Sequence, residues 1–335
     1  MNPRFRSLAL SAFSLSLLLA ASGCETSNCE TEEGNNAVCA ESLKKFTVAG
    51  AEQTIEVDYE PGRDLVVDNI KGTIHVNEGL DAGKISITFE PFTYRGHSKD
   101  AEAKDEIENK FSASFEWSED DEAYIARTDR GSGSSDELGA EITVNLPPEF
   151  DGALRVVNQG GGELNPGDVI VNFTALSPSV ELENKSSVGD CDLDGSATVT
   201  MTRAKCGGNI EIRGISDNVE VVSTGLETGL DVLVQFASIS DDATGGSIKS
   251  DDGQVDVIFP GPNEDDELPN FSVDASTGEG AISVYDLRDD CESDGDDAAQ
   301  SFVCGEGGNA VYTIQAGLDG VGDAPLNLDF DPTNN

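Results

Sequence analysis

The stretch "IEIRGISDNVEVVS" (residues 210–223) decides the fold that this sequence predicts. In its first half Ile210 and Ile212 alternate with charged residues, and in its second half Val219 and Val221 are separated by Glu220. Such alternation is typical of half-buried strands, because successive side chains of a strand point to opposite faces of the sheet. The "SDN" between the halves favours a tight turn. The stretch therefore predicts two half-buried strands joined by a short turn.

The same pattern recurs on both sides of this stretch, separated by Gly, Asp, Ser or Asn turns. The recurring segments are "LRVV" (154–157), "VELEN" (180–184), "LDVLV" (230–234) and "VDVIFP" (255–260). Apolar positions return every 7 to 11 residues, and 36 glycines accompany few aromatic residues. This repetition predicts an all-β chain of short strands, arranged either as a β-solenoid or prism-like stack or as a sandwich.

The part before this repeat, residues 46–150, predicts further strands and one helix. Alternation marks strands such as "TIEVDY", "KISITFE" and "EITVNL", whereas "SKDAEAKDEIENKF" (98–111) places Ala103, Ile107 and Phe111 on one helical stripe behind Ser98 as a cap. The spacer "GSGSSDELG" (131–139) is expected to be exposed. We thus predict an N-terminal β region with one short helix over 46–150 and a repetitive β region over 151–330.

The N-terminus carries an export signal over residues 1–23. Arg4 and Arg6 precede an apolar stretch that is too short to cross a bilayer. The closing "AASGC" resembles the lipobox of bacterial lipoproteins, although Ala21 stands where Leu is usual, and this resemblance implies that Cys24 carries the lipid. An ordinary secretory signal with a chance cysteine is the alternative. We expect an exported protein held in the envelope, at the outer membrane, by its lipid, with residues 24–45 as an acidic tether.

The seven cysteines favour three local disulfides. Setting Cys24 aside leaves six, which fall into three close couples. Disulfides place the chain in an oxidising compartment, and the absence of CxxC spacing disfavours a metal thiolate site. The expected pairs are Cys29 with Cys39, Cys191 with Cys206, and Cys291 with Cys304.

The acidic balance limits the partners. Without the signal the chain has 18 basic and 65 acidic residues, a net charge of 18 − 65 = −47. Nucleic acid and anionic lipid surfaces are therefore poor partners, and the membrane is contacted only through the N-terminal lipid. No GxSxG, HExxH or P-loop motif is present in the sequence.

Two acidic segments, "DCDLDG" (190–195) and "DCESDG" (290–295), are candidate calcium loops. Calcium binds six to eight oxygens, but the EF-hand position for a bidentate Glu holds Met201 or Ser301, which excludes an EF-hand. The other interpretation is a pair of disulfide-pinned turns, two variants of one hairpin module that each end in a Gly-Gly-Asn. Apart from this structural calcium, no cofactor is expected. The candidate ligands are Asp190, Asp192 and Asp194 in the first segment and Asp290, Glu292 and Asp294 in the second.

A family resemblance adds to this prediction. The order of elements over 46–290, carried by "ITVNLPPEFDGALRVVNQGGG" (142–162), "GGSIKSDDGQVDVIFP" (245–260) and "FSVDASTGEGAISV" (271–284), resembles the uncharacterised bacterial β-strand-repeat family described as putative adhesins. The two acidic segments depart from the family pattern, so a function of those segments is not implied by it. The resemblance implies a lipoprotein that binds rather than catalyses.

We therefore expect a lipid-anchored envelope protein whose acidic β surface serves non-catalytic binding, adhesion or scaffolding, with an unidentified ligand. The alternative is a polysaccharide-active β-helix enzyme, a lyase or hydrolase. Such an enzyme needs clustered acids in a groove and usually an aromatic wall, and the chain has one tryptophan and five tyrosines.

Overall fold

In the computed structural model, the described residues are 46–79, 81–95, 100–160, 167–172, 179–195, 201–224, 232–251, 253–262, 267–278, 280–305, 308–317 and 324–330. They all belong to one compact unit, Lys45–Asn335. None of the helical residues in these ranges forms a segment long and apolar enough to cross a membrane. The predicted signal and the acidic tether lie outside the described residues.

The strands form two 12-stranded sheets. Sheet A contains β1 (Phe46–Ala49), β2 (Gln53–Asp58), β4 (Ile74–Glu78), β5 (Lys84–Arg95), β8 (Gly139–Leu146), β10 (Val169–Asn172), β12 (Cys191–Asp194), β14 (Ile210–Ser216), β16 (Val232–Ser238), β18 (Val255–Ile258), β20 (Ile282–Tyr285) and β24 (Leu326–Asp329). Sheet B contains β3 (Asp64–Asn69), β6 (Phe111–Ser118), β7 (Ala123–Arg130), β9 (Leu154–Asn158), β11 (Val180–Asn184), β13 (Met201–Cys206), β15 (Asn218–Ser223), β17 (Gly245–Ser250), β19 (Phe271–Thr277), β21 (Cys291–Gly295), β22 (Ala299–Cys304) and β23 (Ala310–Ala316).

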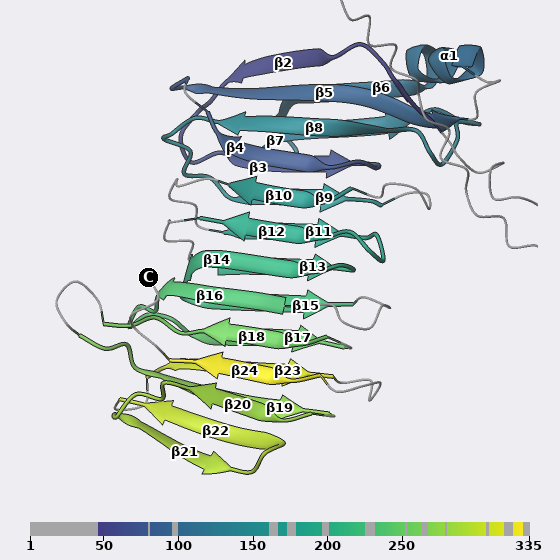
Figure 1. Cartoon of the computed structure of the whole chain (residues 1–335). Coiled ribbons are helices and arrows are strands. Elements are labelled where there is room, and N and C mark those ends of the chain that lie inside the picture. Colours follow the sequence, from purple (N-terminus) through teal and green to yellow (C-terminus); the bar gives the residue numbers. More distant parts are fainter. Residues whose placement is uncertain are drawn as a thin grey trace, which may run out of the picture. The chain divides into compact units, whose positions relative to one another are not determined.

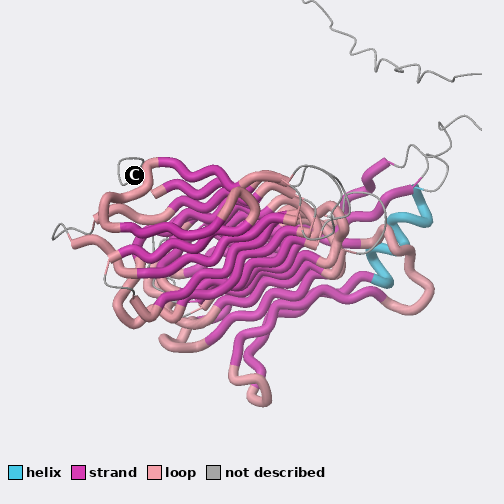
Figure 2. The backbone as a smooth tube through the Cα atoms, turned by 90° about the horizontal axis from the view of Figure 1, so that it is seen from below, coloured by secondary structure: helices cyan, strands magenta, loops and turns pink. Residues whose placement is uncertain are grey.

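The chain alternates between the sheets, so that one strand of sheet B and the next strand of sheet A make a rung. Successive rungs β9–β10, β11–β12, β13–β14, β15–β16 and β17–β18 pair with their neighbours in parallel in both sheets. The rungs are stacked in Figure 1, and the view from below in Figure 2 shows their strands lying over one another. The predicted all-β fold is confirmed, and the stacked rungs are the solenoid form of it.

The core lies between the two sheets. Along β11, for example, Val180 and Leu182 are buried and the glutamates between them face outward. Each rung repeats this arrangement, and burying one such aliphatic side chain stabilises the fold by about 1.5–3 kcal/mol. Near the C-terminal end, Phe236, Phe259 and Phe271 stack with centroid separations of 5.6 and 4.7 Å. Alternation in the sequence thus maps directly onto the inner and outer faces of the two sheets.

At both ends of the stack, a rung that comes later in the chain is inserted between two earlier ones. At one end, rung β7–β8 is inserted between β3–β4 and the antiparallel strands β5 and β6. At the other end, rung β23–β24 is inserted between β17–β18 and β19–β20, and the antiparallel strands β21 and β22 cover β19. Antiparallel edge strands interrupt the repeating parallel edge, which protects a stack against continued edge-to-edge pairing.

A row of buried asparagines crosses sheet B at the C-terminal ends of its strands. Asn69, Asn158 and Asn184 are paired in register on β3, β9 and β11. The amide of Asn184 donates to the carbonyls of Gly167 (3.0 Å) and Asp190 (3.2 Å), both in the turns that lead to sheet A. Turn carbonyls that would otherwise be buried without a partner are satisfied in this way.

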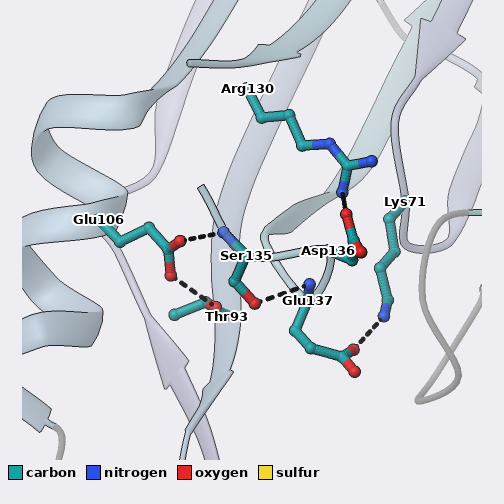
Figure 3. Close-up of polar contacts among 7 residues, drawn as sticks. All are labelled: Lys71, Thr93, Glu106, Arg130, Ser135, Asp136 and Glu137. Atoms are coloured by element: carbon teal, nitrogen blue, oxygen red, sulfur yellow. Dashed lines mark hydrogen bonds and ion pairs between the residues drawn. The ribbon is translucent and has the colours of Figure 1, made fainter. Parts of the chain in front are cut away.

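The helix α1 (Asp100–Lys110) lies at the N-terminal end of the stack and is held by buried polar contacts. As predicted, Ala103 and Ile107 are buried, whereas Phe111 was wrongly placed on the helix and begins strand β6. Figure 3 shows Glu106 of α1 facing Thr93 and the backbone N–H of Ser135, to which its carboxylate is hydrogen-bonded.

The same close-up contains a buried ion pair. The Lys71 ammonium is fully buried and lies 2.5 Å from the Glu137 carboxylate. Leu138 is also buried, so the second half of the spacer 131–139 packs against the sheets. The prediction of an exposed spacer was wrong for this half. The apolar Leu138 is buried, and the buried Glu137 carboxylate is paired with Lys71.

Candidate binding surface

The first acidic segment is a strand, and the interpretation of "DCDLDG" as a loop was wrong. In β12, Cys191 and Leu193 point into the core, whereas Asp192 and Asp194 lie on the outer face of sheet A. The alternate aspartates thus follow strand periodicity. Because alternate residues of a strand are roughly 6.6 Å apart, this conformation spreads the carboxylates along the sheet.

Asp190 belongs to a ladder of polar side chains that crosses sheet A. Thr73, Asp168 and Asp190 each precede the first residue of a strand in sheet A. The backbone N–H of Asp168 donates to Thr73 Oγ1 (3.4 Å), and that of Asp190 donates to Asp168 Oδ1 (3.0 Å). The N–H of Asn209 in turn donates to Asp190 Oδ1 (2.7 Å). Each side chain therefore caps the next rung, which gives Asp190 a structural role.

Burial and neighbouring carboxylates raise the pKa of two aspartates in this region. Partial burial, together with the neighbouring Glu211, Asp190 and Asp168 carboxylates, raises the pKa of Asp192 to about 6. Burial also raises the pKa of Asp190 above its usual range. Within the described ranges, no group of three or more His, Cys, Asp or Glu side chains is arranged to hold a metal ion.

The second acidic segment differs from the first in topology. Cys291 and Cys304 face each other on the antiparallel strands β21 and β22 and form a disulfide. Asp290 precedes this hairpin and accepts two hydrogen bonds from the Arg288 guanidinium (2.9 and 2.6 Å), which lowers the pKa of its carboxyl. Glu292 and Asp294 are exposed on β21.

The Cys191–Cys206 disulfide, in contrast, joins two strands in different sheets. Cys191 begins β12 in sheet A and Cys206 ends β13 in sheet B, and both are fully buried. The two segments are therefore not variants of one hairpin module, because only the second disulfide closes a hairpin. The other predicted cysteine sites, Cys24, Cys29 and Cys39, lie outside the described residues.

The outer face of sheet B carries a regular pattern of charge. Along β7, β3, β9, β11, β13, β15 and β17, the first, third, fifth and seventh strands bring basic side chains and the strands between them bring carboxylates. We call this set, with Lys185 at its rim, the sheet B track. Its basic members are Arg127, Arg155, Lys185, Arg203, Lys205 and Lys249, and its acidic members are Asp68, Glu181, Glu183 and Glu220.

Ion pairs connect the neighbouring strands of the track. Arg155 lies 3.2 Å from Glu181 and 3.5 Å from Glu183, and Arg203 lies 3.3 Å from Glu220. Opposite charges on adjacent strands stabilise a sheet, and each pair contributes about 0.2–1 kcal/mol. The pairs hold the guanidinium and carboxylate groups in fixed positions while leaving much of each side chain exposed to solvent.

Two lysines of the track stand apart from these pairs. Lys205 on β13 and Lys249 on β17 are separated by Val222 on β15 in the same register row. In the part of the chain that the structure describes, no ion pair or hydrogen bond engages either ammonium group. Lys185, beside them, donates to Gln159 (2.7 Å). The named members of the track comprise six basic and four acidic side chains, but Asp64 on β3 and Asp129 on β7 lie on the same outer face, so this face carries as many acidic as basic groups. Basic groups predominate only at the strand ends, where Lys185, Lys205 and Lys249 lie around Glu183.

Four adjoining hollows follow the track. The first, of about 420 Å³, lies over β3, β7 and β9, and it shares Glu181 with a second of about 210 Å³ over β11, β13 and β15. The second shares Glu183 and Lys205 with a third of about 430 Å³, and Arg203 and Glu220 with a fourth of about 380 Å³. The hollows thus form one shallow channel across seven strands, a span of roughly 29 Å at 4.8 Å per strand.

Sequence reasoning did not find this track. Its residues are separated by turns of unequal length, so the sequence does not show which of them lie side by side. The only signal was the repeated placement of single charges between apolar residues, as in "RVV", "VELE" and "RAK". On sheet A, Asp192 and Glu211 are cross-strand neighbours, and the expected acidic binding surface stays a prediction.

Comparison with known proteins gives two similar solved structures. One is a putative cell adhesion protein from Clostridium sporogenes ATCC 15579, with 11% identity, a TM-score of 0.29, and coverage of 84% of this chain and 100% of that one. The other is a putative adhesin from Bacteroides fragilis NCTC 9343, with 12% identity, a TM-score of 0.36, and coverage of 83% and 97%. Both are described as adhesion proteins, as is the family that the sequence resembles. Neither a family model nor a curated protein matches the sequence.

Proposed function

We propose that this chain is an exported, lipid-anchored and non-catalytic binding protein that uses the sheet B track as its ligand surface. The observation that carries the proposal is the channel of four adjoining hollows on one face, lined by charged groups at fixed strand intervals. Concave surfaces with a few positioned polar groups are where proteins bind ligands.

The rigidity of the track suits binding. Its strands are all paired on both sides in a 12-stranded sheet, and the inward side chains beside them, such as Leu154, Leu182 and Val221, are buried. A ligand therefore meets side chains whose backbone is already ordered, which lowers the entropic cost of binding. Many shallow contacts along one face also suit an anchored protein, because display on a surface multiplies weak contacts.

A binding panel tests the proposal. The full chain carrying Cys24→Ser, which prevents lipid attachment, is exported, purified and applied to immobilised polysaccharides, collagen and fibronectin. We expect at least one of these to bind, and Arg155→Glu with Arg203→Glu to abolish that binding. The matched control Arg213→Glu reverses a charge on sheet A and leaves binding unchanged. Failure of every probe, or equal loss in the control, contradicts the proposal.

The same assay separates binding from catalysis. If the polysaccharide is released with new reducing or unsaturated ends, the alternative of a polysaccharide-active enzyme is correct. Binding without new chain ends supports the non-catalytic role.

The anchor and the location need their own test. Fatty-acid labelling should mark the wild-type chain and not the Cys24→Ser variant. Protease added to intact cells should digest the chain if it is displayed at the surface. If only lysed cells lose the chain, it faces the periplasm and the adhesion role fails.

A further inference from the structure

We propose that the sheet B track binds a linear acidic polysaccharide, an inference that rests on the proposed function and names its ligand class. The carboxylates of the polymer contact Lys205 and Lys249, and its hydroxyl groups donate to the carboxylates between the basic strands. Three features of the track favour this ligand: its shape, its lack of an apolar centre and the order of its charges.

The shape fits one extended chain. The four hollows are each only a few hundred Å³. The first, second and fourth adjoin one another in that order along the stack of rungs, and the third opens from the second at the strand ends beside Lys205. A channel of roughly 29 Å that runs across seven strands accommodates several residues of a linear polymer, whereas a compact small molecule would occupy one hollow.

The composition of the track disfavours a protein partner. Protein interfaces have an apolar or aromatic centre from which most of the binding energy comes. The large hydrophobic side chains that are exposed in the described ranges line none of the four hollows. They are Val188, Leu268, Tyr285, Leu287, Val303 and Val311. The hollows are lined by the half-buried apolar side chains of Val66, Ile125, Met201 and Val222, which are dispersed among charged and polar groups.

The order of the charges selects an acidic polysaccharide among hydrophilic polymers. Lys205 and Lys249 are two strands apart, so their backbones are separated by roughly 9.6 Å and their side chains offer separate sites for anions. Glu220 lies on the intervening strand β15 and Glu181 on β11, on the other side of β13, and both carboxylates accept hydrogen bonds. A polyphosphate chain would only be repelled by those carboxylates. A uronic acid polymer supplies both carboxylates for the lysines and hydroxyl donors for the glutamates.

The local excess of positive charge at the strand ends, around Lys185, Lys205 and Lys249, matters because the rest of the molecule repels polyanions. With a net charge of −45 for the whole chain, an acidic polymer can approach only where the local charge is reversed. Binding is therefore expected to be confined to this face and to weaken as salt increases.

Two forms of one polymer test the inference. The exported Cys24→Ser chain is applied to immobilised polygalacturonate and to the same polymer with its carboxyl groups methyl-esterified. We expect binding to the first and at least tenfold weaker binding to the second. Lys205→Gln with Lys249→Gln should weaken binding to polygalacturonate about tenfold, at about 0.7 kcal/mol for each exposed charge contact. The control Lys104→Gln, which removes an exposed charge from α1, should leave it unchanged.

Three outcomes overturn the inference. Equal binding of the esterified polymer shows that carboxylates are not recognised. Equal binding of polyphosphate shows that only charge is recognised. Binding of another panel member at the track, without binding of polygalacturonate, excludes an acidic polysaccharide as the ligand and leaves the proposed function standing.

Two controls accompany this test. A thermal melt of the lysine variant confirms that it is folded. Soluble oligogalacturonate should compete with the immobilised polymer for the wild-type chain, which gives a readout that needs no variant.

Discussion

The carboxylate of Asp190 accepts a hydrogen bond of 2.7 Å from the backbone N–H of Asn209, which lies one rung further along sheet A. Asp168 does the same for Asp190 at 3.0 Å. Side chains that satisfy backbone groups of the next rung tie the rungs together at the point where the chain enters sheet A. These contacts explain why an aspartate precedes β12 without any need for a bound ion.

Two substitutions of Asp190 should distinguish the contribution of its hydrogen bond to stability from that of its charge. Asp190→Ala removes the acceptor of the Asn209 N–H and should lower the free energy of unfolding by about 1 kcal/mol. Asp190→Asn keeps an oxygen acceptor and removes repulsion from Asp168, so its stability should equal or exceed that of the wild type. Urea unfolding of the two variants checks this. Equal destabilisation by both would contradict the capping role.

Calcium should not act through the first acidic segment. Because Asp192 and Asp194 extend along the outer face of a strand, their carboxylates are spread out and Asp190 is already hydrogen-bonded. We expect the melting temperature in millimolar calcium to shift equally for the wild type and for Asp192→Asn with Asp194→Asn. A calcium-dependent rise that this double variant abolishes would restore the calcium hypothesis.

The sequence predicts the local structure well and the pairing poorly. Strand periodicity is a local property, so segments such as 180–184 and 219–223 and the helix near 100–110 are visible in the sequence. In β12 the inward position is a cysteine, and the alternating aspartates match calcium-ligand spacing as well as strand spacing. Local sequence cannot separate these two interpretations, because the partner strands that decide between them are distant.

The sheet B track illustrates the same limit for the site. Arg155 and Glu181, or Arg203 and Glu220, become neighbours only through the parallel register of successive rungs. That register depends on turns of unequal length and on which side chains fill the core. Inserted rungs add to the difficulty, since β17 pairs with β23 and not with β19, which follows it in the chain. A pattern of charges that is regular in space is therefore irregular in the sequence.

Stability should increase as the pH falls toward 5. The pKa of Asp192 is about 6 in the folded chain and near 3.8 in the unfolded chain, so the folded state binds a proton first. Below a pH of about 6 this protonation stabilises the fold, and above it the ionised carboxylate destabilises the fold, by on the order of 1 kcal/mol. Asp192→Asn should be more stable than the wild type at pH 8 and equal to it near pH 4.5. Urea unfolding at both pH values checks the difference, and a constant difference would exclude Asp192 as its source.

The two disulfides should differ in what they stabilise. Cys191→Ala with Cys206→Ala removes a buried link between the sheets and should cost about 3 kcal/mol of global stability. Cys291→Ala with Cys304→Ala opens a terminal hairpin and should increase hydrogen exchange mainly in β21 and β22. Hydrogen exchange followed by mass spectrometry distinguishes the two. Exchange that spreads through the central rungs in the second variant would show that the hairpin supports the whole stack.

Removing only one partner of the buried pair of Lys71 and Glu137 should strongly lower the free energy of unfolding. Lys71→Met leaves the Glu137 carboxylate buried without its cation, and we expect a loss of about 3–5 kcal/mol in unfolding free energy. Adding Glu137→Gln removes the uncompensated charge and should recover much of that loss. The exposed pair of Lys84 and Glu56, at 3.3 Å, is the matched control, and Lys84→Met should cost less than about 1 kcal/mol. If Lys71→Met costs no more than Lys84→Met, the ion pair does not fix the 131–138 segment against the N-terminal rungs, and the packing of Leu138 must hold that segment instead.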